Sequence, residues 1–200
     1  MDFFKNNIRK YIYLNILFYS VLGLAMVLGC LYPENQQQFY EKTHTAISSI
    51  NFLADMKVHI FSGQIIYLLP LAGFFLVKNF LSALLTIGLP NTIIPFSGFL
   101  TGFYQAAVFG YGFAPTKGIN LSTLGSLFLV ILEGQGAILV MLGSWVWSSH
   151  WFSFQSYGHP SRIAGYKYGF QLFLKATLFS VLILFVAAIY ETLLIWQTGI

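Results

Sequence analysis

The segment from Leu121 to Trp147 constrains this chain most, because it is apolar and long enough to cross a bilayer. Its sequence is LSTLGSLFLVILEGQGAILVMLGSWVW, in which Glu133 and Gln135 alternate with Gly134 and Gly136 near the middle. A carboxylate at that depth costs about 2.5–3.5 kcal/mol on insertion scales. Glu133 must therefore be protonated, paired, or turned toward protein or water. The segment predicts either one helix with a polar notch or two half-helices that meet near the membrane midplane.

The composition of the whole chain agrees with a membrane protein. Charged residues make up 8% of the chain and hydrophobic residues 57%, whereas globular chains typically carry about 25% charge. The formal net charge of +4 is small, so the chain has no basic surface of the kind that binds nucleic acid. We expect an all-α polytopic transmembrane bundle, whose partners are the lipid bilayer and other membrane protein subunits. The single cysteine, Cys30, excludes an internal disulfide.

Hydropathy and turn residues divide the chain into about five spans within one integral membrane domain, residues 1–200. Lys78 and Asn79 are expected to mark a tight return between the second and third spans. Pro90 and Pro95 predict a break in the third span near residues 90–95, because proline cannot continue the helical hydrogen-bond pattern. Gly134 and Gly136 are expected to interrupt the fourth. The expected spans are residues 11–31, 58–77, 79–113, 121–147 and 170–196, with polar loops at 34–57 and 148–169.

The distribution of basic residues predicts the orientation. An N-terminus in the cytoplasm places six basic residues on the inner side and three on the outer side, which the positive-inside rule favours. We therefore expect a bacterial inner membrane protein with a cytoplasmic N-terminus. The inner set is Lys5, Arg9, Lys10, Lys78, Arg162 and Lys167, and the outer set is Lys42, Lys57 and Lys117.

Candidate functional residues are the polar side chains within or beside the spans. Glu133, Gln135, Glu191, Asn79 and Gln64 are predicted to pack helices together or to bind a partner helix, since polar side chains hydrogen-bond across helices in membranes. Glu191 lies near the end of its span and Glu133 near the middle of another. This offset in depth disfavours a shared-proton pair of carboxyls.

The sequence contains none of the common catalytic or cofactor motifs. It has no Walker loop, no G-x-G-x-x-G, no H-E-x-x-H, no C-x-x-C and no G-x-S-x-G. All four histidines lie outside the expected spans or at their edges, and none has a spacing typical of metal ligands. We therefore expect no cofactor, no metal and no enzymatic activity.

The second half of the chain resembles the stage II sporulation protein M family of membrane proteins. Three patterns carry the resemblance: Lys78-Asn79-Phe80-Leu81-Ser82-Ala83-Leu84, Glu133 with Ala137 and Ile138, and Ala187-Ala188-Ile189-Tyr190-Glu191-Thr192. The similar region covers roughly residues 62–195. Leu129 and Val130 stand where the family usually has His-Gly. The resemblance implies a five-span protein with no known enzymatic chemistry, in a family whose founding members work in a complex with cell-wall hydrolases.

Three functions are compatible with these features. The first is a non-catalytic membrane subunit or scaffold that packs into a larger complex. The alternative is a small transporter or channel-like protein in which Glu133 binds a cation or relays a proton, with the broken third and fourth spans meeting around it. An intramembrane enzyme is the third, and it would need a nucleophile or metal beside Glu133 that the sequence does not contain.

Overall fold

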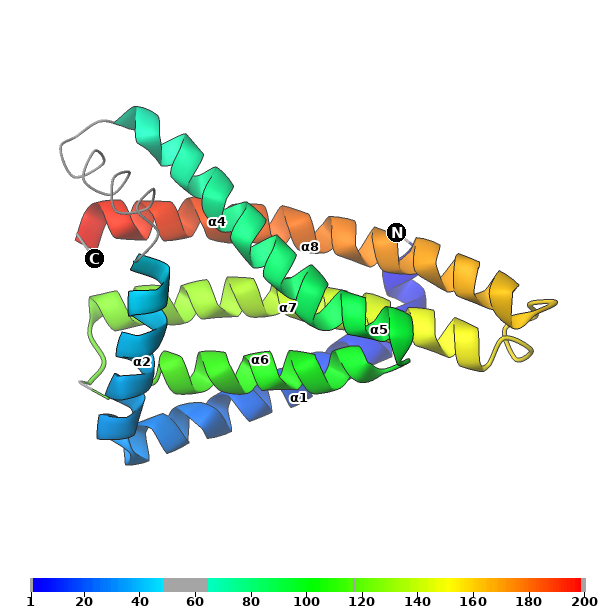
Figure 1. The fold of residues 1–200 in the computed structure, drawn as a ribbon, viewed down its shortest axis with the longest axis horizontal. Coiled ribbons are helices and arrows are strands. Elements are labelled where there is room, and N and C mark those ends of the chain that lie inside the picture. The colour runs from blue at the N-terminus through cyan, green and yellow to red at the C-terminus, as the bar shows by residue number, and fades with distance from the viewer. Residues whose placement is uncertain (1, 49–64, 117, 199–200) are drawn as a thin grey trace.

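The computed structural model describes residues 2–48, 65–116 and 118–198, and this part of the chain is helical with short connecting turns. It forms one bundle of helices that run mostly side by side (Figure 1). The elements in chain order are α1 (Asp2–Leu31), α2 (Pro33–Ser48), the 3₁₀ turn η1 (Ile65–Tyr67), α4 (Leu68–Ala83), the π-helical η2 (Leu84–Gly88), α5 (Leu89–Ile93), α6 (Ser97–Gly112), α7 (Leu121–Phe152) and α8 (Arg162–Thr198).

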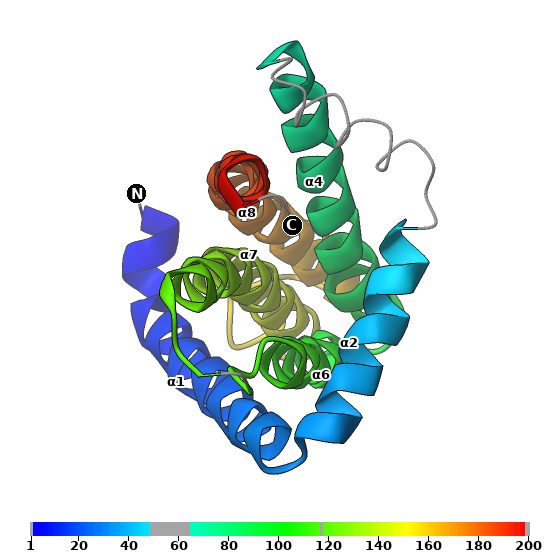
Figure 2. The same ribbon diagram turned by 90° about the vertical axis from the view of Figure 1, so that its left-hand side faces the viewer.

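In the described part of the chain, four helical stretches are long and apolar enough to cross a membrane. They are Phe3–Leu31, Leu68–Ile93, Thr123–Phe152 and Arg162–Gln197. The expected all-α fold with helices of membrane-spanning type is confirmed. The expected count of five spans is not confirmed, because four stretches of the described chain are long and apolar enough. Helix α6 has 16 residues and falls short of the required length. Helix α7 is the most buried of the four and lies among α1, α6 and α8 when the bundle is viewed along its length (Figure 2).

Helices α7 and α8 form a long antiparallel hairpin that extends beyond the other helices at one end of the bundle (Figure 1). Glycines allow the two backbones to approach closely. A Cβ atom added at Gly169 would lie 2.9 Å from the Trp147 backbone, and one at Gly136 would meet the Leu184 side chain at 2.6 Å. The Ser180 hydroxyl donates to the Gly136 carbonyl oxygen at 2.8 Å. The Gly134–Gly136 segment thus serves helix packing.

The predicted interruption of the fourth span is wrong, because α7 continues without a break from Leu121 to Phe152. Each glycine costs a helix about 1 kcal/mol relative to alanine. The close packing of α1 and α8 against Gly134 and Gly136 offsets this cost. A Cβ at Gly134 would lie 3.0 Å from the Phe18 ring of α1, so a larger residue would require this ring to shift.

The tight return expected at Lys78 and Asn79 is also wrong. Helix α4 passes through both residues and continues through η2 and α5 to Ile93. Both polar side chains find partners inside the protein: the Lys78 ammonium lies 5.2 Å from the centre of the Phe75 ring, and Asn79 donates to Glu133. The two polar residues were expected to mark the end of a span because the sequence alone does not reveal these partners.

The expected third span, residues 79–113, is wrong as a single crossing, because one helical stretch ends at Ile93 and α6 runs back from Ser97 (Figure 1). The helix does break near residues 90–95 as expected, but the break is a reversal of the chain at Ile94–Phe96. Phe96 adopts a left-handed conformation with φ of 66°, and α6 begins at the next residue. The π-helical turn η2 ends at Gly88, two residues before Pro90. There the Leu89 N–H donates to the Leu84 carbonyl oxygen five residues back, so this turn of the helix is wider than an α-helical turn. The wider turn relieves the clash that a proline ring makes with the turn before it.

Helix α6 packs closely against α1 and α7 through small residues. Gly98, Gly102, Ala106 and Gly110 are buried at a spacing of four. A Cβ at Gly110 would overlap the backbone of α1, and one at Gly102 would overlap the Met141 side chain of α7. The spacing of these residues therefore sets which face of α6 is buried.

Helix α2 lies across one end of the bundle (Figure 1). The buried Gln36 amide donates to the Gly112 carbonyl oxygen at 2.8 Å, and the Phe39 ring packs edge-on against Tyr111 at 5.6 Å. These contacts fix α2 to the C-terminal end of α6. The expected polar loop at 34–57 thus begins as a helix, and residues 49–64 lie outside the described part of the chain. The second polar loop is shorter than expected, since α7 extends to Phe152 and α8 begins at Arg162.

Candidate functional site

The polar side chains of the spans form separate clusters between pairs of helices. In the largest, the Gln135 amide of α7 meets α1. The Tyr11 hydroxyl donates to Gln135 Oε1 at 2.5 Å, and Gln135 Nε2 donates to Asn15 Oδ1 at 2.7 Å and to the Tyr19 oxygen at 2.9 Å. The Tyr19 hydroxyl donates in turn to the Ile131 carbonyl oxygen at 3.0 Å. The Gln135 amide therefore has both its nitrogen and its oxygen bonded within the chain.

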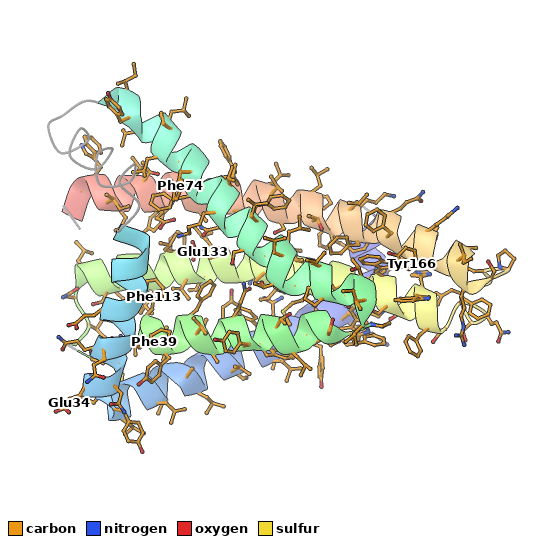
Figure 3. All side chains as sticks on the ribbon, in the orientation of Figure 1. Glu34, Phe39, Phe74, Phe113, Glu133 and Tyr166 are labelled. Carbon is orange, nitrogen blue, oxygen red and sulfur yellow. The ribbon has the colours of Figure 1, made fainter. Side chains whose placement is uncertain are left out.

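Glu133 lies on another side of α7, next to α4. Asn79 Nδ2 donates to Glu133 Oε1 at 2.5 Å, and the Lys78 charge is near enough to act on the carboxyl. Glu133 is 9% exposed, and Figure 3 labels it in the middle of α7. The Asn79 amide and the Glu133 carboxyl form a tie between α4 and α7, and a carboxyl is also the group that a cation or proton site would use.

Glu133 and Gln135 do not form one site. A step of two residues along a helix turns the side chain by about 200°, so residues 133 and 135 point to nearly opposite sides of α7. The bonding agrees, because Glu133 contacts α4 whereas Gln135 contacts α1. Helix α7 uses the two polar residues to hold two different neighbours.

A third cluster holds the turn between α5 and α6 against α7. Asn91 is 1% exposed, donates to the Ser144 carbonyl oxygen at 3.2 Å and accepts from the Ser148 hydroxyl at 3.0 Å. The Phe96 N–H, which the break in the helix leaves without a helical partner, donates to Ser148 Oγ at 3.1 Å. Irregular backbone at membrane depth needs this kind of partner, because hydrocarbon offers no hydrogen bonds.

Glu191 is not brought near Glu133. The neighbouring Tyr190 hydroxyl donates to the Gly125 carbonyl oxygen at 3.2 Å, which places this part of α8 level with the start of α7. Eight helical positions then separate that level from Glu133, about 12 Å at the rise of an α-helix. The predicted offset in depth between the two acids agrees with this arrangement. Gln64 lies outside the described residues.

Two histidines meet at the turn of the α7–α8 hairpin. His150 Nδ1 and His159 Nε2 lie 2.9 Å apart, and the ring of Tyr157 packs 4.0 Å from that of His150. Within the described ranges, no group of three or more histidine, cysteine, aspartate or glutamate side chains lies close enough to hold a metal ion. The pair closes the turn by a direct hydrogen bond between the two rings.

The sequence analysis missed most partners of these polar residues. Tyr11, Asn15 and Tyr19 recur every four residues, so they form a polar stripe on one face of an apolar helix. Ser144 and Ser148 have the same spacing on α7. A search for polar residues at this spacing within apolar spans would have found both sets.

No protein-family model, curated protein sequence or solved structure matches this chain. The resemblance to the stage II sporulation protein M family therefore stays a prediction.

Proposed function

We propose that this protein is a non-catalytic integral membrane subunit that packs into a larger membrane protein assembly. The observation that carries the proposal is the use of the polar groups inside the spans. The Gln135 amide makes three hydrogen bonds to α1, and Asn91 bonds α7 through Ser144 and Ser148. These side chains hold helices together, which is the role that a scaffold requires of them. Membership of the stage II sporulation protein M family would fit this role and is part of the proposal.

The proposal includes five crossings of a bacterial inner membrane with the N-terminus in the cytoplasm. Helix α6 runs between the same two ends of the bundle as its neighbours, and its 16 residues give about 24 Å, compared with roughly 30 Å of hydrocarbon. The two termini lie at opposite ends of the bundle (Figure 1), as an odd number of crossings requires. Lys5, Arg9 and Lys10 at the start of α1 and Arg162 and Lys167 at the start of α8 support a cytoplasmic location for that end.

The test is to extract a tagged chain from its native membrane in mild detergent and to identify the co-purifying proteins by mass spectrometry. We expect other integral membrane proteins in stoichiometric amounts. Glu133→Gln should retain them, because a glutamine carbonyl can accept the Asn79 hydrogen bond. Glu133→Leu should reduce them, since it leaves the Asn79 amide without this acceptor. Equal recovery of partners with both variants, or no partners with the unmodified chain, would contradict the proposal.

The second candidate function is transport of a cation or proton through Glu133. It is favoured by the position of the carboxyl beside Asn79 and the Lys78 charge, in the middle of a helix that crosses the bundle. Purified protein in liposomes would then support ion flux, and Glu133→Gln would abolish it. Flux that is absent from the unmodified protein would exclude this candidate.

A further inference from the structure

The outer face formed by the end of α4, η2 and α6 carries polar side chains at mid-depth. Gln105 Nε2 donates to Thr86 Oγ1 at 2.7 Å and to Ser82 Oγ at 3.4 Å, and both Ser82 and Thr86 are exposed. Tyr104, the neighbour of Gln105, is 71% exposed. Helix α6 runs from Ser97 to Gly112, so Tyr104 and Gln105 lie at its midpoint, about 12 Å from either end. We call the set Ser82, Thr86, Tyr104 and Gln105 the mid-depth polar face.

This face has hydrogen-bonding capacity that the described chain does not use. The donors of Gln105 are bonded to Thr86 and Ser82, but its carbonyl oxygen accepts no hydrogen bond from a described residue. Within the described ranges, the Tyr104 hydroxyl likewise makes no hydrogen bond. Hydrocarbon cannot satisfy either group, so both are more stable against a protein surface than against lipid.

We propose that the mid-depth polar face binds a second copy of this chain. The unused donor, Tyr104, and the unused acceptor, Gln105, are adjacent in sequence and therefore lie at one depth. In a two-fold dimer whose axis runs along the membrane normal, each level of one copy faces the same level of the other. Tyr104 of each copy then donates to Gln105 of the other, and both groups are satisfied. A single unrelated helix would need its own donor and acceptor at that depth, whereas a second copy supplies both.

Exposed apolar side chains lie on the same helical segments and on the residue that follows η2, as the contact between two membrane helices requires. Leu85 of η2, Leu89 at the start of α5 and Leu100 of α6 are 54%, 52% and 77% exposed. Helix α2 crosses only one end of the bundle and leaves the middle of α6 accessible (Figure 1). The proposal goes beyond the proposed function, because two copies can meet here whichever other subunits are present. It does rest on the placement of α6 across the bilayer.

The test is disulfide cross-linking in native membranes, in a Cys30→Ser background that removes the native thiol. Thr101→Cys and Val108→Cys place a thiol one helical turn from Gln105 on either side. Leu178→Cys places one on α8, where residue 178 is 64% exposed. We expect oxidation to link two copies through position 101 or 108 and not through position 178.

Two further variants show whether the polar groups hold the dimer. Tyr104→Phe removes the donor with little change in shape, and Gln105→Leu removes the acceptor. Loss of the two reciprocal hydrogen bonds should weaken dimerisation about eight-fold in either variant, at the typical strength of such bonds in membranes. Since Gln105 also bonds η2, Tyr104→Phe is the decisive variant. An unchanged dimer in Tyr104→Phe would overturn the assigned donor and acceptor.

A water-soluble maleimide separates failure of the dimer from failure of the membrane placement. If the cysteines at 101 and 108 are shielded from the reagent but link no two copies of the chain, the dimer is overturned and the membrane placement of α6 stands. Cysteines that react fully would show that α6 does not cross the bilayer. A cross-link from either position to a different protein would assign the face to a heteromeric contact and would also overturn the proposal.

Discussion

Replacing Gln135 by leucine tests directly whether the polar side chains inside the spans act as ties between helices. The change removes three hydrogen bonds, to Tyr11, Asn15 and Tyr19, and keeps a side chain of similar size. Interhelical hydrogen bonds in a membrane protein average about 0.6 kcal/mol, with a maximum of about 1.7. Gln135→Leu should therefore lower the free energy of unfolding by about 2 kcal/mol and by no more than about 5.

Reversible unfolding in mixed micelles of dodecylmaltoside and sodium dodecyl sulfate would measure this change. The matched control is Gln171→Leu, the same chemical change at an exposed position of α8, which should alter stability by less than about 0.5 kcal/mol. Tyr11→Phe, alone and combined with Gln135→Leu, completes a double-mutant cycle. The cycle should give a coupling energy near 0.6 kcal/mol for the bond between the Tyr11 hydroxyl and Gln135 Oε1.

Equal effects of Gln135→Leu and Gln171→Leu would refute this reasoning. So would strict additivity of the Tyr11 and Gln135 changes, because two groups that share a hydrogen bond must couple. A more stable Gln135→Leu variant would show that removing the amide from the bundle stabilises the fold by more than its three hydrogen bonds do. In that case Gln135 would be retained for a reason other than stability.

The other predictions concern the remaining contacts between elements. Asn91→Leu should destabilise the fold by about 1–3 kcal/mol because it leaves its buried partners on α7 unpaired. Thr92→Val should cost less than about 1 kcal/mol, since the Thr92 hydroxyl bonds only its own helical turn. Thermal unfolding in detergent compares the two variants. Gly110→Ala should reduce stability because its Cβ would overlap the α1 backbone, whereas Gly73→Ala on α4 meets nothing and should raise stability by about 0.5–1 kcal/mol in the same assay. Gln36→Ala should release α2 from α6, seen as faster amide hydrogen exchange confined to α2.

The membrane-type helical fold could be predicted from sequence because its signals are local. Long apolar runs predict membrane-spanning helices, and Pro95 lies in the reversal at Ile94–Phe96, since a proline acts on its own backbone. Pro90 does not end its helix, because the π-helical turn η2 before it makes room for the ring. The prediction failed at Lys78 and Asn79 because their polarity is compensated by Phe75 and Glu133. The last of these partners is more than fifty positions away in the sequence, and no local pattern reveals such a contact.

The candidate site was predicted in part for the same reason. Glu133, Gln135 and Asn79 were singled out by their polarity within apolar segments, and the structure pairs Asn79 with Glu133 and places Gln135 against α1. Which helix each of them faces depends on rotation about the helix axis. A span prediction gives only the ends of a helix and not this rotation. The polar stripe of α1 carried that information, because residues four apart share a face.

The mass of the particle that contains this chain is the most direct test of the central claim that it is a membrane assembly subunit. Light scattering on a detergent extract of the native membrane, fractionated by size, gives the protein mass without the bound detergent. The account predicts a mass well above twice the 22.5 kDa of the chain, with other membrane proteins in the same fraction. A particle of one or two copies of this chain and nothing else would contradict it.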